Sequence, residues 1–388
     1  CPQHPEAGAL MKRETKIKIA VVLQSLCQGL QYTVSPVLNQ VGQAYPTVPT
    51  SLVQMLVTAP ALTSMAVALA AGWLVTKIPK KRLVLLGCLV MGALGIAPMA
   101  GGGFGMLLLS RLLMGAGMGL LMSLSTAIIA DYFDGAERTA VMGLQGAGAG
   151  GGVLLASLLG GMAGKTDFRG IYPLHLIAFV YLAGIALCLP ESEPTPPKQG
   201  EKLTLNRQVF ALCGITALEA VLFTAFTTNI SMHLSGAAET ATLIAGRLTA
   251  LFSVTQIGAG LCLGTVNRWT KGRTLPLAVF QAALGGACLC LGNGPLLLVV
   301  GAIAFGLSQG LFIPSAMGAV THMVPPSSVT LAAACVTISI NAGQFLSPVV
   351  LNGLADALPG TSTTGTVFGV TAALAVLLTA VLLWKKKK

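Results

Sequence analysis

The sequence of 388 residues contains very little charge. Asp, Glu, Lys and Arg make up 9% of it, whereas soluble globular domains carry about 25% charged residues. So few charges cannot cover a surface that faces water, and 54% of the residues are hydrophobic. The composition therefore excludes an ordinary water-soluble domain and indicates a chain that lipid surrounds.

The sequence also lacks the residue patterns that catalysis or metal binding requires. It has no grouping of His, Asp and Glu, no glycine-rich phosphate loop and no soluble catalytic segment. Almost all of its nine cysteines fall inside apolar runs, at spacings that match neither a metal site nor a disulfide framework. We therefore expect no enzyme, no cofactor and no metal site, and interpret the cysteines as small packing residues.

The basic balance of the chain does not point to nucleic acid. Lys and Arg outnumber Asp and Glu by 23 to 12, which gives a formal net charge of +11. These charges lie at the ends of apolar runs rather than along one soluble face. The expected surroundings are therefore the lipid bilayer of the cell membrane, without a nucleic-acid partner.

The apolar runs predict an all-α integral membrane fold of twelve transmembrane helices. Each run has roughly 20 or more mostly apolar residues, enough to cross the bilayer core as a helix. A polar, proline-rich stretch divides them into two sets of six. The predicted spans are 17–39, 51–76, 82–101, 104–131, 138–163 and 171–190, then 207–234, 240–266, 274–292, 295–321, 327–355 and 364–384.

These spans define the expected domain organisation. Two six-helix bundles are joined by a cytoplasmic linker and flanked by short polar ends. The boundaries are an N-terminal cytoplasmic leader over 1–15, a bundle over 16–190, the linker over 191–206, a second bundle over 207–384 and a basic tail over 385–388.

The positions of Lys and Arg predict the orientation of the chain. Basic residues precede the first span, occupy alternate connections and the linker, and close the chain, whereas the other connections carry only Lys165 and Arg169. Because cytoplasmic loops carry the excess of Lys and Arg, both termini and the linker are expected in the cytoplasm.

Glycines repeat at a nearly constant offset between the two sets of spans. Gly115 and Gly119 correspond to Gly306 and Gly310, an offset of 191 positions, and Gly152 corresponds to Gly343. Glycines at four-residue spacing let helix backbones approach closely in lipid. Such glycines occur in many membrane bundles, but the coincident matches favour a duplicated six-helix unit.

The loop after the second span resembles a motif of the major facilitator superfamily, G-x-L-a-D-r-x-G-r-r. It reads Gly72-Trp-Leu-Val-Thr-Lys-Ile-Pro-Lys-Lys81, with Thr76 in place of the family's Asp and Pro79 in place of its second Gly. Since the family's Asp helps to hold the cytoplasmic gate shut, Thr76 predicts a weaker lock.

Two further spans carry the same resemblance. The fourth is similar to the family's R-x-x-x-G-x-G pattern at Arg111, Gly115 and Gly117. The fifth partly resembles the antiporter motif G-x3-G-P-x2-G-G: Gly152, Gly160 and Gly161 match it, while Ala156 and Ser157 replace its Gly-Pro. The chain thus resembles the superfamily over essentially residues 12–385, and the drug:proton antiporters most closely.

This resemblance implies two bundles around a central cavity, with substrate bound near the membrane midplane and rocking of the bundles between two open states. It also implies a cytoplasmic gate between the basic loop and the end of the fourth span. The expected gate residues are Gly72, Lys77, Lys80, Lys81, Asp131, Glu137 and Arg138.

Polar residues inside the spans are the candidates for lining that cavity, because polar groups that face lipid are costly. On the first and eleventh spans they form helical stripes. The alternative is that they only join neighbouring helices by hydrogen bonds. The predicted substrate-binding residues are Gln24, Gln28, Gln31, Thr228, Asn229, Gln256, Gln309, Asn341 and Gln344.

Three charged residues lie well inside the spans: Arg111, Glu219 and Arg247. Each should face a partner or a wet cavity, because a charge at a helix centre costs about 2.5–3.5 kcal/mol on insertion scales. Glu219 is the only carboxylate near the middle of a span, and burial disfavours its charged form, which suits it to carry protons. Alternatively, it is the structural partner of an arginine.

The resemblance links Arg111 to proton handling, so Glu219 and Arg111 are the predicted proton-coupling residues. Alternatively, Arg111 is a gate or packing residue anchored to backbone carbonyls. Arg247 is expected to extend its charge to the outer face of the membrane. His175 and His233 are expected at the membrane interface.

These observations together predict a secondary transporter, and a monomer, of prokaryotic origin. The resemblance to drug:proton antiporters, together with Glu219, implies proton-coupled efflux. Two positive groups against one negative inside the spans favour a neutral or weakly anionic amphipathic small molecule as the substrate. The alternatives are proton-coupled uptake or facilitated diffusion of a small metabolite or organic anion, and then a non-transporting sensor or a channel.

Overall fold

The computed structural model describes residues 4–191, 205–234, 238–292, 294–320, 322–325, 328–358 and 364–385. The regular elements in these ranges are all helices. The N half contains α1 (His4–Gln28), η1 (Gly29–Val37), α2 (Leu38–Ala44), α3 (Thr50–Leu74), α4 (Lys80–Ile96), η2 (Ala97–Ala100), α5 (Gly103–Tyr132), α6 (Gly135–Ala163), η3 (Phe168–Leu176) and α7 (Ile177–Cys188).

The C half contains α8 (Arg207–His233), α9 (Ala238–Leu261), α10 (Leu263–Trp269), α11 (Thr274–Leu291), α12 (Pro295–Val320), α13 (Val329–Asp356) and α14 (Thr364–Lys385). Ten spans are long and apolar enough to cross a membrane, and α9 with α10, bent by 64°, forms an eleventh. Together with α1, η1 and α2, these elements match the twelve predicted spans.

The first helix differs from its predicted span in two ways. Helix α1 begins at His4, so helix runs through most of the predicted leader. The first span then tightens into the 3-10 helix η1, which contains Pro36. Proline lacks the N–H that an α-helix needs inside its hydrogen-bond ladder. At the start of η1, the backbone of Gly29 packs directly against the backbone of Gly152, since a Cβ at Gly29 would lie 2.1 Å from the Gly152 carbonyl carbon.

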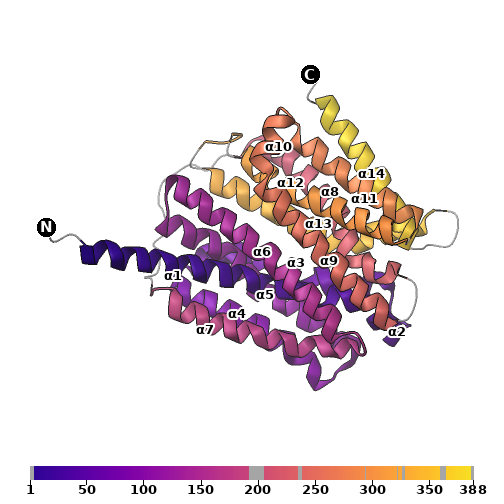
Figure 1. The fold of residues 1–388 in the computed structure, drawn as a ribbon, viewed down its shortest axis with the longest axis horizontal. Coiled ribbons are helices and arrows are strands. Elements are labelled where there is room, and N and C mark those ends of the chain that lie inside the picture. The colour runs from indigo at the N-terminus through magenta and orange to yellow at the C-terminus, as the bar shows by residue number, and fades with distance from the viewer. Residues whose placement is uncertain are drawn as a thin grey trace.

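Each half has its own hydrophobic core. In the N half, buried side chains from α1, α4, α5 and α7 form one cluster, and a smaller cluster surrounds η1, α2 and η3. In the C half, a single cluster runs from α8 to α14. The halves meet where α6 packs against α9 and α3 against α13, as Figure 1 shows for the indigo-to-magenta and orange-to-yellow parts of the ribbon.

The repeated glycines occupy equivalent helix crossings in the two halves. A Cβ at Gly115 would lie 2.1 Å from the Pro60 carbonyl oxygen of α3, and one at Gly306 would lie 2.4 Å from the Phe252 carbonyl oxygen of α9. Since no side chain fits at such distances, only glycine allows α5 to cross α3 and α12 to cross α9.

The same holds for the second repeated pair. A Cβ at Gly152 would lie 2.5 Å from the Leu26 carbonyl oxygen of α1, and one at Gly343 would lie 2.2 Å from the Ala217 carbonyl oxygen of α8. The offset seen in the sequence therefore has a physical cause, which is backbone contact repeated in both halves.

The two ends of the bundle differ in packing. We call the end where α2 and α6 finish in the N half, and α8 and α13 in the C half, the distal end, and the opposite end, with both chain termini, the terminal end. All residues from 219 to 231 of α8 are buried toward the distal end, whereas many between 207 and 218 are exposed. In Figure 1 the halves meet at the right, and α1 and α14 carry the termini away from each other.

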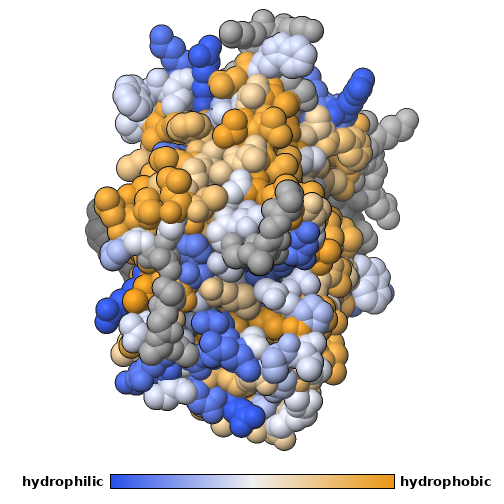
Figure 2. All heavy atoms as spheres, turned by 90° about the vertical axis from the view of Figure 1, so that its right-hand side faces the viewer, coloured by the Kyte–Doolittle hydropathy of each residue, from blue (hydrophilic) through white to orange (hydrophobic). Residues whose placement is uncertain are grey.

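Figure 2 views the molecule from the distal side. Hydrophilic residues gather over the lower part of this face and again at its upper rim, and apolar residues predominate between them. Large apolar side chains on the outside of the bundle are strongly exposed, including Leu187 at 81% and Val180 at 67%. Such a surface is the one expected where lipid tails replace water.

Candidate functional site

Glu219 is the only carboxylate among the described residues that lies near the middle of a spanning helix. It projects from α8 and is fully buried. Its Oε1 accepts a hydrogen bond from the Ser308 hydroxyl of α12 at 2.6 Å, and its Oε2 is buried with no hydrogen-bond partner among the described residues. One oxygen is thus held in place and the other is free to carry a proton.

The position of Ser308 follows from the glycines on either side of it in α12. Gly306 and Gly310 bring α12 against α9, where their missing side chains leave room for backbone contact. Ser308 lies between them and is itself fully buried. Because Gly306 and Gly310 share the face of α12 toward α9, Ser308, two residues from each, lies on the opposite face, where it meets Glu219 of α8.

Arg111 of α5 is the corresponding buried charge of the N half. It is 2% exposed, and its Nη1 lies 3.5 Å from the Gln31 carbonyl oxygen of η1. Its Nη2 is buried and has no hydrogen-bond partner among the described residues. Because a long hydrogen bond to one carbonyl satisfies a guanidinium poorly, Arg111 has donors free for an anionic or strongly accepting group.

His175, expected at the membrane interface, lies instead in the interior beside Arg111. It is fully buried, with Nδ1 at 3.2 Å from the Tyr172 carbonyl oxygen and Nε2 at 3.4 Å from the Thr33 hydroxyl. A Cβ at Gly95 would clash with its ring. The prediction was wrong because His175 lies on the buried face of η3, which it shares with Phe168, Ile171 and Tyr172, and a hydropathy pattern does not reveal this.

The third predicted charge and the second histidine lie toward the surface. Arg247 is exposed on α9, in line with a side chain that extends to the interface. His233 is half-buried at the distal end of α8, with Nδ1 at 3.0 Å from the Thr364 hydroxyl and its ring edge-on to Phe368.

The predicted substrate-binding glutamines of the first span have different surroundings. Gln24 is 1% exposed, and its Nε2 donates to the Leu121 carbonyl of α5 at 2.6 Å, so it holds α1 against α5. Gln28 and Gln31 are half-buried, and Nε2 of Gln28 has no partner among the described residues. A role in substrate binding stays a prediction and fits Gln28 better than Gln24.

The predicted substrate-binding residues of the C half also divide by burial. Thr228 is fully buried, and its hydroxyl donates to the Thr224 carbonyl of its own helix at 3.0 Å. Gln309 and Asn341 are 7% and 3% exposed, whereas Gln256 and Gln344 are half-buried. Oε1 of Gln256 has no partner among the described residues. Substrate binding by these residues likewise stays a prediction.

Asn229 lies at a junction that the sequence analysis missed. Its Oδ1 accepts a hydrogen bond at 2.8 Å from Nε2 of Gln54 on α3, while Oε1 of Gln54 accepts one at 2.7 Å from Nδ2 of Asn352 on α13. Gln54 is fully buried. The available signal was a lone amide inside the apolar second span, from which the sequence predicted no substrate-binding residue.

At the terminal end, the predicted gate residues form ion pairs within the N half. Lys80, only 6% exposed, pairs with Asp131, and Glu137 pairs with Lys18 at 2.6 Å. Lys81 lies 3.7 Å from Glu191.

The other predicted gate residues are exposed on the surface. Gly72, Lys77 and Arg138 are exposed, and a Cβ at Gly72 would meet nothing within 4 Å. The Thr76 hydroxyl, at the position of the family's Asp, donates at 2.7 Å to the Trp73 carbonyl at the end of α3. The gating role of these residues stays a prediction.

The chemistry that these groups support is binding and proton exchange. One half offers a buried guanidinium with free donors and the other a buried carboxyl with a free oxygen. Within the described residues, no group of three or more His, Cys, Asp and Glu side chains could hold a metal ion.

Comparisons with known proteins agree with this description. The family model described as the Major Facilitator Superfamily matches residues 19–296 and, in a second match, residues 209–388. The second match covers the C half, as expected for a duplicated unit. A search of curated protein sequences finds no match.

Solved structures of transporters are similar to this chain. The peptide transporter POT in complex with sulfate has a TM-score of 0.74 and 17% identity over 94% of each chain. A mutant of the nucleoside transporter NupG has a TM-score of 0.75 and 13% identity over 96% of this chain and 99% of that one. At these identities the similarity shows a shared fold.

Proposed function

The chain belongs to the Major Facilitator Superfamily, a family of secondary transporters rather than enzymes, and we propose that it exports a small, neutral or weakly anionic, partly apolar molecule in exchange for protons. The observation that carries this proposal is Glu219, a fully buried carboxyl near mid-span with one oxygen held by Ser308 and the other unpartnered.

A proton carrier must exist in both protonation states during the cycle. An isolated carboxylate is costly in a low-dielectric interior, so Glu219 favours its protonated form when buried as it is here. Movement of α8 against α12 that admits water would let the proton leave. Because exposure and proton release are then linked, a proton gradient can drive the change of conformation.

The placement of basic residues indicates which side of the membrane each end of the bundle faces. The basic residues of the connections gather at the terminal end, which we therefore place in the cytoplasm, with both termini and the linker. The two halves are closed at the distal end, whereas many residues of α8 are exposed at the terminal end. These two features together describe a state that is open to the cytoplasm. Thr76, in place of an acidic lock, favours this state.

The expected charge of the substrate follows from Arg111. The free donors of its guanidinium suit a carboxylate, a carbonyl or another acceptor, and a cation would be repelled with little screening in a dry cavity. Gln28 and Gln256 add amide groups without charge. Together these groups favour a neutral or weakly anionic molecule over the lipophilic cations that many exporters carry.

The test uses purified protein reconstituted in proteoliposomes. A panel of lipophilic cations, neutral compounds and organic acids of matched size is first scored by thermal stabilisation, since a ligand that binds only the folded state raises the melting temperature. Compounds that stabilise the protein are then followed across the membrane under an imposed pH gradient. Proton-driven movement of a neutral or anionic compound supports the proposal, and tight binding of the cations alone contradicts it.

A second candidate function is uptake of a polar metabolite. The observation that favours it is the similarity in fold to a peptide transporter and a nucleoside transporter. The direction in which an inward or outward proton gradient accumulates the compound separates uptake from efflux.

A further inference from the structure

Gln54 joins both halves of the protein at the distal end. It lies on α3 of the N half, and both polar atoms of its side chain contact the C half: Nε2 donates to Oδ1 of Asn229 at 2.8 Å, and Oε1 accepts from Nδ2 of Asn352 at 2.7 Å. Nδ2 of Asn229 is held in turn by the Ala225 carbonyl at 3.0 Å. The three amides therefore form one fixed network across the interface.

A reciprocal pair of serines closes the neighbouring contact. The Ser35 hydroxyl of η1 donates to the Thr227 carbonyl of α8 at 2.5 Å, and the Ser231 hydroxyl of α8 donates to the Pro36 carbonyl of η1 at 2.6 Å. Both serines are fully buried. Each half thus donates one hydroxyl to a backbone carbonyl of the other.

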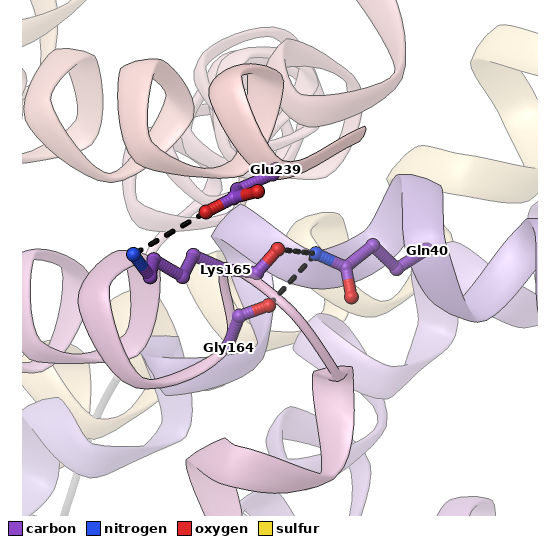
Figure 3. Close-up of polar contacts among 4 residues, drawn as sticks. All are labelled: Gln40, Gly164, Lys165 and Glu239. Atoms are coloured by element: carbon purple, nitrogen blue, oxygen red, sulfur yellow. Dashed lines mark hydrogen bonds and ion pairs between the residues drawn. The ribbon is translucent and has the colours of Figure 1, made fainter. Parts of the chain in front are cut away.

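The charged contact between the halves lies at the surface. Lys165 and Glu239 are 3.3 Å apart, with side chains that are 47% and 52% exposed. Beside them, Nε2 of Gln40 donates to the Gly164 and Lys165 carbonyls, as Figure 3 shows, and to the Thr242 hydroxyl at 2.7 Å. An ion pair this exposed contributes little to stability.

We propose that the distal gate is held shut by an uncharged latch consisting of Gln54, Asn229, Asn352 and the two serines Ser35 and Ser231. Opening the distal end must break both hydrogen bonds of Gln54, and an amide without its partners in a dry interface is costly. The latch therefore favours the closed distal end, and water must enter the interface before the halves can part.

The latch contains no group that changes charge with pH. Titratable residues at the distal end lie outside it: Lys165, Asp167 and Glu239 line a surface pocket of about 460 Å³, and Asp356, one turn beyond Asn352 on α13, is exposed. His233 on α8 contacts Thr364 and Phe368 within the C half. Under this proposal, acid or salt does not open the latch directly, and any effect of protons on the gate starts elsewhere in the molecule.

The decisive experiment makes the latch titratable. Gln54→Glu keeps the shape of the side chain: when protonated, the new carboxyl can still donate to Asn229, and when ionised it can only accept. Spin labels on noncanonical amino acids at the exposed positions Thr166 and Leu358 report the distance between the halves at the distal end. The Glu219→Gln variant serves as the background, because it removes the proton site of the proposed transport cycle.

In that background we expect a short distance with Gln54 under both acidic and alkaline conditions. With Gln54→Glu we expect the short distance in acid and a shift to longer distances in alkali. Asn352→Asp should behave in the same way, since ionised Asp cannot donate to Gln54. Gln43→Glu, at an exposed position on the same face, is the matched control and should leave the distance unchanged.

An unchanged short distance for Gln54→Glu in alkali overturns the proposal, as does an equal shift in the Gln43→Glu control. Size-exclusion chromatography under both conditions establishes that each variant is folded, and Asn352→Asp decides the matter if Gln54→Glu does not fold. The measurement needs neither substrate nor flux, so its outcome is independent of whether the assignment of efflux is correct.

Discussion

The two halves cross their helices at matching glycines but bury different chemical groups. Gly152 brings α6 onto α1 in the N half, as Gly343 brings α13 onto α8 in the C half. Inside its spanning helices, however, the N half buries Arg111 and the C half buries Glu219. The repeat therefore preserves what packing requires, and we propose that the function depends on the positions at which the halves differ.

A single substitution should disrupt this shared packing, and it should cause the largest loss of stability among our predictions. A valine at Gly343 would place its Cβ 2.2 Å from a carbonyl oxygen of α8, which cannot move without moving the helix. Overpacking usually costs about 1–3 kcal/mol and occasionally more, and contact with backbone belongs at the upper end of that range. Gly343→Val should lower the melting temperature sharply or abolish the folded peak in chromatography.

The matched control for that change lies on the same helix. A Cβ at Gly353 meets nothing within 4 Å, so Gly353→Val should leave the melting temperature close to that of the wild type. The same comparison can be made on α6 of the N half, where Gly152→Val is the destabilising variant and Gly143→Val is its control. Equal effects of the two valines on one helix would show that backbone contact is not the reason for the repeat.

The second prediction concerns the charge that distinguishes the N half. Arg111→Gln should weaken the binding of an anionic or carbonyl-bearing ligand by on the order of tenfold or more, which is about 1.4 kcal/mol, because its free donors are lost. Arg247→Gln, on an exposed side chain of the C half, should leave affinity unchanged. Titration of the ligand found in the stabilisation screen measures both, and equal affinities of the two variants would refute a binding role for Arg111.

The smallest effect is expected at the terminal end. Lys80→Gln removes the partner of Asp131, whose side chain is 42% exposed, and exposed pairs contribute roughly 0–1 kcal/mol. We expect a decrease in melting temperature of a few degrees at low salt that diminishes at high salt. Lys77→Gln, at an exposed position, should show no such salt-dependent change. A large loss that salt does not affect would instead indicate a structural role for the buried lysine.

The sequence predicted the fold closely because lipid imposes a strong pattern on it. Run length and charge placement were enough to find the spans. They did not show the bend between α9 and α10 or the 3-10 segment η1, which begins where Gly29 packs against Gly152, a residue far away in the chain.

The candidate site was less predictable. Glu219 and Arg111 were identified as single charges in apolar runs, a signal that needs no knowledge of neighbours. By contrast, Gln54 and His175 take their roles from partners on other helices. Gln24 lies on the same helical stripe as Gln28 and was predicted to bind substrate, but its side chain donates to the Leu121 backbone carbonyl. Helical periodicity predicts a face but does not say what lies opposite it.

The central claim is that Glu219 couples substrate movement to protons, and Glu219→Gln tests it most directly. The amide matches the protonated carboxyl in shape and can still accept from Ser308, but it cannot release a proton. In proteoliposomes, accumulation driven by a pH gradient and exchange of labelled for unlabelled substrate without a gradient are measured on the same preparation. We predict that accumulation is lost while exchange continues near the wild-type rate, and accumulation at the wild-type level in Glu219→Gln would contradict the account.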